Sequence, residues 1–112
     1  MKVKVYIASP LAIGDKEQNV RNSFEMGNKI IDLGANPYCP LYNYFLDAEK
    51  PRDGEFWLQL DFDWLRACDV VLRMPGESVG ADMETALANE IGIPVVYSIE
   101  QLAEYFGLIE QY

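Results

Sequence analysis

The sequence predicts a single-domain α/β protein with a doubly wound (flavodoxin-like or Rossmann-like) parallel sheet of four to five strands flanked by helices. The first reason is that short runs of β-branched residues alternate with longer stretches of helical periodicity. The second is that 112 residues, of which 50% are hydrophobic and 24% charged, suit one globular domain over residues 1–112. In such a sheet, ligands bind outside the carboxyl ends of the strands. We therefore expect the functional site in the segments that follow residues 8, 39 and 73.

The first strand and the first helix are indicated by alternation and by capping residues. Residues 2–8 place valine and isoleucine at every second position, which is typical of a strand with a buried face. Asp15, with Gln18 three residues later, is the predicted N-cap of a helix, and Gly34 is its predicted end. The residues expected to face inward from this helix are Val20, Phe24, Ile31 and Leu33.

The rest of the chain continues the alternation of strands and helices. Ser78 and Ser98 are predicted helix N-caps, and Gly92 is the predicted end of the helix that Ser78 begins. The expected elements are, in order, a strand at 36–39, a loop rich in aromatic and charged residues at 41–54, a helix at 55–68, a strand at 69–73, a helix at 78–91, a strand at 93–97 and a last amphipathic helix after Ser98.

Composition excludes several classes of function. The net charge of −9 disfavours a nucleic-acid polymer as a partner, although a local cluster of donors can hold a small anion. The chain has no histidine, and Cys39 and Cys68 lack metal-ligand spacing, so we expect no metal, no cofactor and no Ser-His or Cys-His nucleophile. No apolar run approaches the ~20 residues of a membrane span, and we expect a cytoplasmic protein with no membrane partner. Catalysis would then depend on carboxylates, hydroxyls, amines and backbone dipoles.

Asp61 interrupts the apolar side of the helix predicted at 55–68. On a wheel of about 100° per residue, it lies one turn from Trp57 and from Leu65. Burying a lone carboxylate is costly, so Asp61 has either a chemical role or a structural one as a cap on a neighbouring loop. The apolar stripe comprises Leu60, Trp64, Trp57, Cys68 and Leu65, and the solvated side comprises Gln59, Asp63 and Arg66.

Glu84 is a second acid that falls away from the polar side of its helix. The solvated stripe of residues 78–91 comprises Asp82, Thr85 and Asn89, and the expected inward residues are Met83, Leu87 and Ile91. Taken alone, Glu84 is equally consistent with a structural role. However, two misplaced acids near one crevice are typical of enzymes that cleave glycosidic bonds.

The turn at residues 74–80 supplies small residues at a helix N-terminus, where free N–H groups and the helix dipole favour an anion such as phosphate. It is not a P-loop, because neither GxGxxG nor GxxxxGK[ST] is present. Ser78 either contacts such an anion or only caps the helix. Arg73, at the carboxyl end of its strand, is a further candidate donor.

Three stretches in order resemble the nucleoside 2-deoxyribosyltransferase superfamily, and most closely its branch of 2′-deoxynucleoside 5′-phosphate N-hydrolases. They are YIASP at 6–10, DFDWLRACDVV at 61–71, and SVGADMETALA at 78–88 followed by GIPV at 92–95. By this resemblance, Glu84 is the carboxylate nucleophile that forms a covalent glycosyl-enzyme. Asp61 assists the leaving base or orients the sugar, and Tyr6 lies beside the nucleophile. The resemblance also implies that Ser78 and Gly80 are the phosphate-contacting Ser-x-Gly. The full set of expected substrate-binding residues is Ser9, Ser78, Gly80, Tyr42, Asn43, Trp57 and Arg73.

The expected function is cleavage of the N-glycosidic bond of 2′-deoxynucleoside 5′-monophosphates, with a small nucleoside or nucleotide as the partner. Water as the acceptor gives a hydrolase, and a second nucleobase gives a transferase. The same fold would also suit a non-catalytic nucleotide-binding module or an oligomerising structural domain. The aromatic residues Tyr38, Tyr42, Tyr44 and Phe45 offer flat faces for a nucleobase, or else form a lid or a dimer contact. A homodimer or a higher homo-oligomer is expected.

Overall fold

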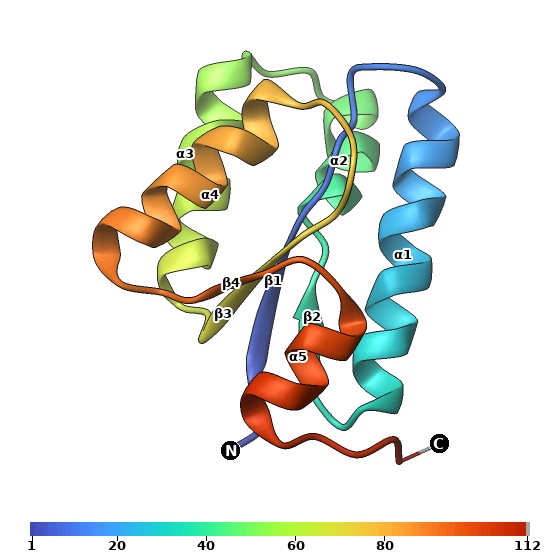
Figure 1. The fold of residues 1–112 in the computed structure, drawn as a ribbon. Helices are drawn as coiled ribbons and strands as arrows, with labels where there is room; N and C mark the ends of the chain where they lie inside the picture. The colour runs from blue at the N-terminus through green and yellow to red at the C-terminus, as the bar shows by residue number, and fades with distance from the viewer. Residues whose placement is uncertain (112) are drawn as a thin grey trace.

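Four parallel strands form the centre of the structure, a computed structural model that describes residues 1–111. Helices lie between successive strands, so each crossover returns the chain to the end of the sheet where the previous strand began (Figure 1). The elements are β1 (Lys4–Ala8), α1 (Lys16–Asp32), β2 (Asn36–Tyr38), the 3₁₀ helix η1 (Pro40–Tyr42), α2 (Asn43–Glu49), α3 (Gly54–Arg66), β3 (Val70–Arg73), α4 (Val79–Ile91), β4 (Val95–Val96) and α5 (Ile99–Phe106).

The sheet has the order β2-β1-β3-β4, and all of its neighbouring strands pair in parallel. The predicted fold class, an α/β fold with a parallel sheet of four to five strands, is confirmed. β1 lies in the interior, where Tyr6 pairs in register with Tyr38 of β2 on one side and with Val71 of β3 on the other. Because the direction of winding reverses between β1 and β3, a crevice opens outside their carboxyl ends.

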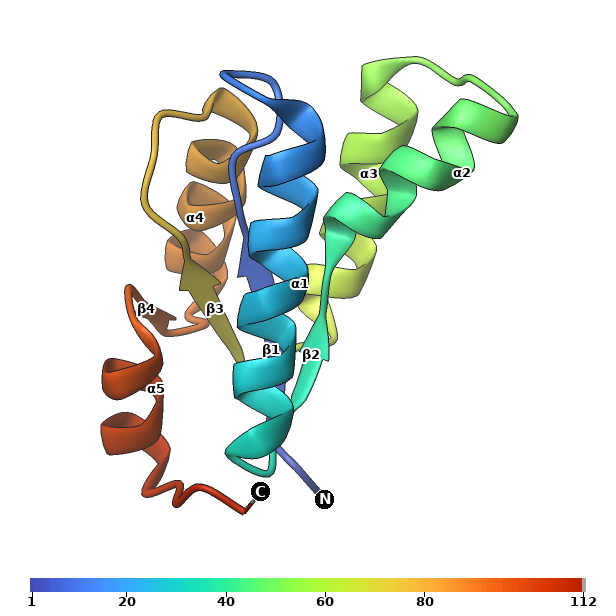
Figure 2. The ribbon, with the colours of Figure 1, turned by 90° about the vertical axis from the view of Figure 1, so that its right-hand side faces the viewer.

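Helices cover both faces of the sheet and bury two hydrophobic clusters (Figures 1 and 2). On one face, Ile30 of α1 and Leu102 of α5 pack against the strands. On the other face, Leu65 of α3 and Ala88 of α4 pack against the side of β1 that carries Tyr6. No helix among residues 1–111 combines the length and the apolar character needed to cross a lipid bilayer.

The predicted capping residues are confirmed. The side chain of Asp15 accepts a hydrogen bond from the Gln18 N–H at 3.1 Å, and the Ser98 hydroxyl accepts one from the Gln101 N–H at 3.0 Å. Gly92 ends α4 with a φ of 81°, in the left-handed region that glycine adopts without a steric cost. Local sequence therefore sets the ends of these helices.

The predicted inward faces of α1 and α4 are partly wrong. Ile31 is 45% exposed, and Met83 and Ile91 are each 43% exposed. On α1 the buried residues are instead Val20, Ser23, Gly27 and Ile30; on α4 they are Ala81, Glu84 and Ala88. The physical reason is close approach, since a Cβ at Gly27 would lie 3.0 Å from the Cys39 sulfur. Small residues let each helix backbone approach the sheet, and this turns the larger apolar residues outward.

Three further expectations are corrected. The loop expected at 41–54 folds in part as η1 and α2, and the strand expected at 93–97 is reduced to Val95–Val96. Thr85, expected in solvent, is half-buried, and its hydroxyl donates to the Ala81 carbonyl at 2.9 Å. Trp64, expected inward, is 51% exposed, because its ring stacks on Tyr38 at the sheet edge with centroids 5.1 Å apart.

Candidate active site

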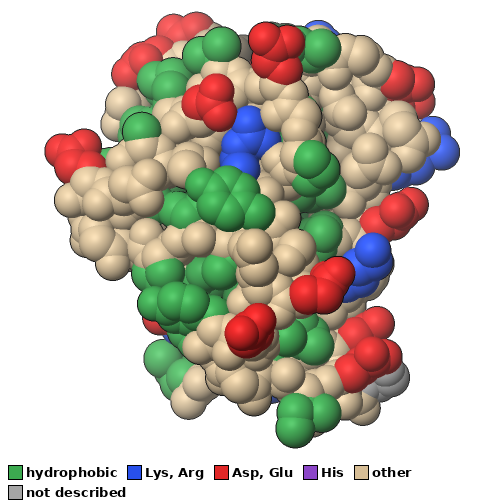
Figure 3. Space-filling model, viewed as in Figure 1, with side chains coloured by type: hydrophobic (Ala, Val, Ile, Leu, Met, Phe, Trp, Pro, Cys, Tyr) green, Lys and Arg blue, Asp and Glu red, His purple; other side chains and the backbone are tan. Residues whose placement is uncertain are grey.

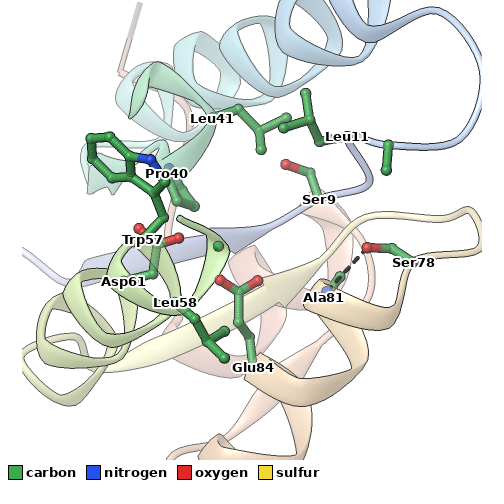
Figure 4. Close-up of a pocket in the computed structure, with 13 residues that line it drawn as sticks. Ser9, Leu11, Pro40, Leu41, Trp57, Leu58, Asp61, Ser78, Ala81 and Glu84 are labelled. Carbon is green, nitrogen blue, oxygen red and sulfur yellow. Dashed lines mark hydrogen bonds between the residues drawn. The ribbon is translucent and has the colours of Figure 1, made fainter. Parts of the chain in front are cut away.

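A cleft of about 220 Å³ opens at the carboxyl ends of β1, β2 and β3 (Figure 4). Its walls come from the segments that follow these three strands and from the facing sides of α3 and α4, as the sequence predicts. The lining residues are Ser9, Leu11, Ala12, Pro40, Leu41, Gly54, Trp57, Leu58, Asp61, Ser78, Gly80, Ala81 and Glu84.

Glu84 projects from the buried side of α4 into this cleft and is only 6% exposed. The hydroxyl of Tyr6, which is fully buried on β1, donates a hydrogen bond to Glu84 Oε2. Burial raises the pKa of Glu84 to about 8; the nearby charge of Asp61 also raises it, whereas the Tyr6 hydrogen bond and Arg73 lower it. Burial and the charge of Glu84 raise the pKa of Tyr6, so its phenol remains a donor.

Asp61 enters the cleft from α3, one helical turn after Trp57. The side-chain amide of Asn43 donates a hydrogen bond to Asp61 Oδ1 at 2.9 Å. Burial raises the pKa of Asp61 to about 7, although the Asn43 hydrogen bond lowers it. Asp61, which interrupts the apolar side of its helix, is thus a carboxyl group that changes its charge near neutral pH.

Glu84 and Asp61 form a coupled pair of acids. Each lies in the same cleft, and the charge of Asp61 raises the pKa of Glu84. Between about pH 7 and 8 the pair therefore holds about one proton, which lies mainly on Glu84, the acid with the higher pKa, and in a smaller fraction on Asp61. A cleft with one ionised and one protonated carboxyl group can supply a nucleophile and a proton donor at the same time.

Two serines add hydroxyl groups to the cleft. The Ser9 hydroxyl is buried, has no hydrogen-bond partner among residues 1–111, and points into the space that the Glu84 carboxyl also faces (Figure 4). Ser78 Oγ accepts a hydrogen bond from the Ala81 N–H at 3.1 Å, so Ser78 does cap α4. Its O–H remains free to donate in another direction. Both hydroxyls can therefore donate to a ligand.

The structure places most of the expected site residues in or behind the cleft. Ser9, Trp57, Asp61, Ser78, Gly80 and Glu84 line it. Tyr6 and Asn43 lie behind it and bond to the two acids.

Two expected site residues lie elsewhere. Tyr42 is 57% exposed and does not line the cleft. Arg73 turns its guanidinium away, to the Gly76 carbonyl at 2.9 Å and the Asp82 carboxylate at 3.0 Å. The Arg73 guanidinium is thus bonded to a backbone carbonyl and to Asp82 rather than directed into the cleft.

The aromatic residues of the segment at 38–45 do not line the cleft either. Tyr38 lies between the rings of Tyr6 and Trp64, and Phe45 lies against Phe24 of α1 and against Tyr44. Among residues 1–111, Trp57 is the one aromatic residue in the lining.

Sequence reasoning did not single out the apolar walls. Leu11, Pro40, Leu41 and Leu58 complete the lining and make it largely apolar. The signal in the sequence is position, since Pro40 and Leu41 come two and three residues after β2, and Leu11 comes three residues after β1. Among residues 1–111, no group of three or more Cys, Asp or Glu side chains is arranged to hold a metal ion.

Residues 3–98 match the model of a protein family described as "Domain of unknown function (DUF7768)". The chain belongs to this family. The DUF7768 match includes the whole cleft, because every lining residue falls between positions 9 and 84. A comparison with curated proteins finds no match.

The fold of this DUF7768 domain is similar to that of a 2-deoxyribosyltransferase from the psychrotolerant bacterium Bacillus psychrosaccharolyticus, a biocatalyst for the synthesis of antiviral and antitumoral nucleosides. The TM-score is 0.63 at 19% sequence identity, and the likeness covers 83% of this chain and 69% of that chain. At this identity the comparison shows a shared fold.

Proposed function

We propose that this protein cleaves the N-glycosidic bond of 2′-deoxynucleoside 5′-monophosphates, with Glu84 as the nucleophile and water as the acceptor. The observation that carries the proposal is the buried carboxyl of Glu84, held by the Tyr6 hydroxyl in a cleft that it shares with a second acid, Asp61. A passive nucleotide-binding site gains nothing from two acids beside the sugar. The 2-deoxyribosyltransferase fold of the structural neighbour supports the same chemistry.

The first step uses the form in which Glu84 is ionised and Asp61 carries the proton. Because the pKa of Glu84 (about 8) lies above that of Asp61 (about 7), this is the less populated of the two singly protonated forms of the free protein. The C1′–N bond breaks as Asp61 gives its proton to the departing base, and a C1′–O bond forms to Glu84. The Glu84 carboxylate stabilises the positive charge that develops at C1′ before the bond forms. Tyr6 supports the ionised form, because its hydroxyl donates to Oε2.

In the second step, water attacks C1′ and the bond to Glu84 breaks. The ionised Asp61 takes the proton of that water, which returns both acids to their starting states and releases 2-deoxyribose 5-phosphate. The leaving base is expected to lie between Trp57 and the apolar walls made by Leu58 and Leu41. A flat aromatic face in an apolar wall suits a nucleobase.

A 5′-phosphate is proposed to bind at the start of α4. The donors there are the Ser78 hydroxyl, the N–H groups of the first helical turn and the Ser9 hydroxyl, which has no partner within residues 1–111. A local arrangement of donors is required, because the net charge is −9, and acidic side chains are scattered over the face shown in Figure 3. Gly80 adds no Cβ to this approach, and one built there would come no closer than 4.0 Å to the Ser78 oxygen.

The test of the proposed function is release of free base from a panel of nucleosides and 5′-monophosphates, followed by chromatography. We expect the 5′-monophosphate to have the higher kcat/KM, and Ser78→Ala to reduce that preference by about tenfold. Ser9→Ala is expected to raise KM without lowering Tm, because it removes a buried hydroxyl that has no partner among residues 1–111. A wild-type preference for the unphosphorylated nucleoside would contradict the phosphate site.

A nucleoside 2-deoxyribosyltransferase is the second candidate function, favoured by the fold of the structural neighbour. It uses the same first step, but a second nucleobase then takes C1′ from Glu84. Adding a free base to the assay separates the two, because only a transferase forms a new nucleoside.

We also propose that two copies of this chain associate through α3 and α4. These neighbouring helices expose apolar residues at helical spacing: Phe56 and Trp64 on α3, and Val79, Met83 and Ile91 on α4, with Leu60 and Leu87 half-buried between them. Val79 is 78% exposed and Trp64 is 51% exposed. A second copy fits this face because an isologous pair sets each stripe against another apolar stripe.

Met83→Lys is expected to convert a dimer into a monomer of 12.7 kDa in light scattering, because it places a charge in the middle of the α4 stripe. The exposed Asn89→Lys on the same helix serves as the control and should leave the dimer intact. A wild-type protein that is monomeric at tens of micromolar would contradict the proposal.

A further inference from the structure

Two side-chain hydrogen bonds join α2 to α3 one helical turn apart. Asn43 donates to Asp61 Oδ1 at 2.9 Å, and Asp47 Oδ1 accepts from Trp57 Nε1 at 2.6 Å. The partners are spaced by four residues on both helices, so each pair lies on one helix face. The later residue of α2 meets the earlier residue of α3, as in an antiparallel pair. Both α3 partners line the cleft, whereas neither α2 residue does.

The Asn43 contact determines how Asp61 can carry a proton. An amide N–H only donates, so Asp61 Oδ1 must accept. In the neutral carboxyl group the proton therefore resides on Oδ2, the oxygen that Asn43 does not occupy. Asn43 thus selects the oxygen from which a proton can be given to a ligand.

The Asp47 contact determines how Trp57 presents its ring. Asp47 Oδ1 also accepts from the Arg52 backbone N–H at 2.9 Å, so the same oxygen anchors the connection between α2 and α3. The Arg52 guanidinium lies over the rings of Phe56 and Trp57, 5.1 Å and 5.6 Å from their centroids. The indole is held at its N–H by Asp47 and at its face by Arg52, which leaves it a fixed orientation in the cleft wall.

We propose that α2 is a positioning helix, in which Asn43 sets the proton-donating oxygen of Asp61 and Asp47 sets the ring orientation of Trp57. This inference rests on the proposed function, since it assigns the two contacts to proton donation and to base stacking. Asn43 and Asp47 touch neither the substrate nor the reacting atoms, so they act through the two α3 side chains. Asn43, expected from the sequence to bind substrate, is in this view a positioning residue.

Several titratable groups face Asp61 from the surrounding elements. Glu84 of α4, Tyr6 of β1 and Tyr38 of β2 all interact electrostatically with its carboxylate. Each of these would carry a negative charge when ionised, so none of them stabilises ionised Asp61. Loss of the Asn43 donor should therefore raise the pKa of Asp61 above its value of about 7.

The first test is Asn43→Leu, which removes the donor without adding charge. The pKa of Asp61, read from its carboxyl ¹³C shift, is expected to rise by about one unit or less, and kcat to fall by about tenfold with KM nearly unchanged. The nearly isosteric Asn43→Asp also lacks the donor, and its negative charge should raise the pKa further. If Asn43→Leu does not fold, Asn43→Ala, which likewise removes the donor without adding charge, decides the question. An unchanged pKa of Asp61 in a folded variant would overturn the role of Asn43.

The second test is Asp47→Leu against Asp47→Asn. The leucine removes the acceptor, so the Trp57 indole N–H resonance should move and KM should rise by about tenfold with little change in kcat. The asparagine keeps an acceptor oxygen and should restore both values. Glu49→Gln, an exposed change on α2, is the matched control. Equal KM values for Asp47→Leu and the wild type would overturn the role of Asp47.

The two kinds of failure are distinguishable. A wild-type protein that releases no base from any substrate contradicts the proposed function. The ¹³C and indole measurements need no substrate, and they still decide whether α2 positions Asp61 and Trp57.

Discussion

Glu84→Gln is expected to abolish base release and to stabilise the protein at pH 8. The amide still accepts the Tyr6 hydrogen bond, so the fold is retained, but it cannot form the bond to C1′. Loss of covalent catalysis should lower kcat by about a thousandfold or more, far beyond the tenfold that corresponds to about 1.4 kcal/mol. The measurements are the rate of base release and the free energy of unfolding as a function of pH.

The gain in stability follows from the direction of the pKa shift. Burial raises the pKa of Glu84 from its ordinary value of 4.5 to about 8, so the folded protein binds more protons than the unfolded chain between these values. The free energy of unfolding of the wild type therefore falls as the pH rises through this range. Glutamine remains neutral throughout, and we expect Glu84→Gln to be more stable than the wild type by about 2 to 4 kcal/mol at pH 8 and equal to it near pH 4.

The matched control is Glu90→Gln, an exposed glutamate on the same helix. It should change neither base release nor the pH dependence of unfolding. A Glu84→Gln protein that keeps more than about a tenth of the wild-type rate would contradict the role of Glu84 as nucleophile.

The rate of base release is expected to have a bell-shaped dependence on pH, with limbs near pH 7 and pH 8. Below the lower limb both acids are protonated and the nucleophile is lost; above the upper limb both are ionised and the proton donor is lost. These limbs belong to the coupled pair rather than to either residue. The measurement is kcat/KM from pH 5 to pH 10, with a substrate whose base requires protonation to leave.

Asp61→Asn separates the contributions of the two acids. It should remove the upper limb, because no proton donor remains to ionise. The limb that remains then reports the ionisation of Glu84 alone. It should lie below the pKa of about 8 that Glu84 has in the wild type, because the negative charge of Asp61 is gone. We expect kcat to fall by about a hundredfold for bases that must be protonated, and by much less for a base that leaves as a stable anion. Equal losses for both kinds of base would contradict the role of Asp61 as an acid.

Much of the fold and the central part of the candidate site follow from local features of the sequence. Asp15, Ser78 and Ser98 cap helices because a short polar side chain satisfies the N–H groups that the first turn leaves free. Glu84 and Asp61 stand out in the sequence because a carboxyl group on the apolar side of a helix must be buried or half-buried. The position of the cleft follows from the ends of the predicted strands, since parallel strands bring their carboxyl ends to the same end of the sheet.

Which face of each helix meets the sheet was decided by tertiary packing. The sequence places the larger apolar residues Ile31, Met83 and Ile91 near the inner side, yet all three are exposed. Hydrophobicity alone ranks isoleucine above glycine as an interior residue. At a helix–sheet contact, however, the distance between backbones is minimised by small residues such as Gly27 and Ala88, and the closest packing determines the rotation of the helix.

The surroundings of the two acids also depended on contacts between segments far apart in the chain. Tyr6 meets Glu84 across 78 positions, and Asn43 meets Asp61 across 18. Helix α2 has no buried residue and its N-cap residue makes no side-chain hydrogen bond, so no local pattern distinguishes it from a loop. The pattern of residues along two helices is enough to indicate that two carboxyl groups are withdrawn from water. Which donors meet these carboxyl groups depends on how distant elements pack, because a hydrogen bond needs two groups placed within about 3 Å by elements that fold independently of that bond.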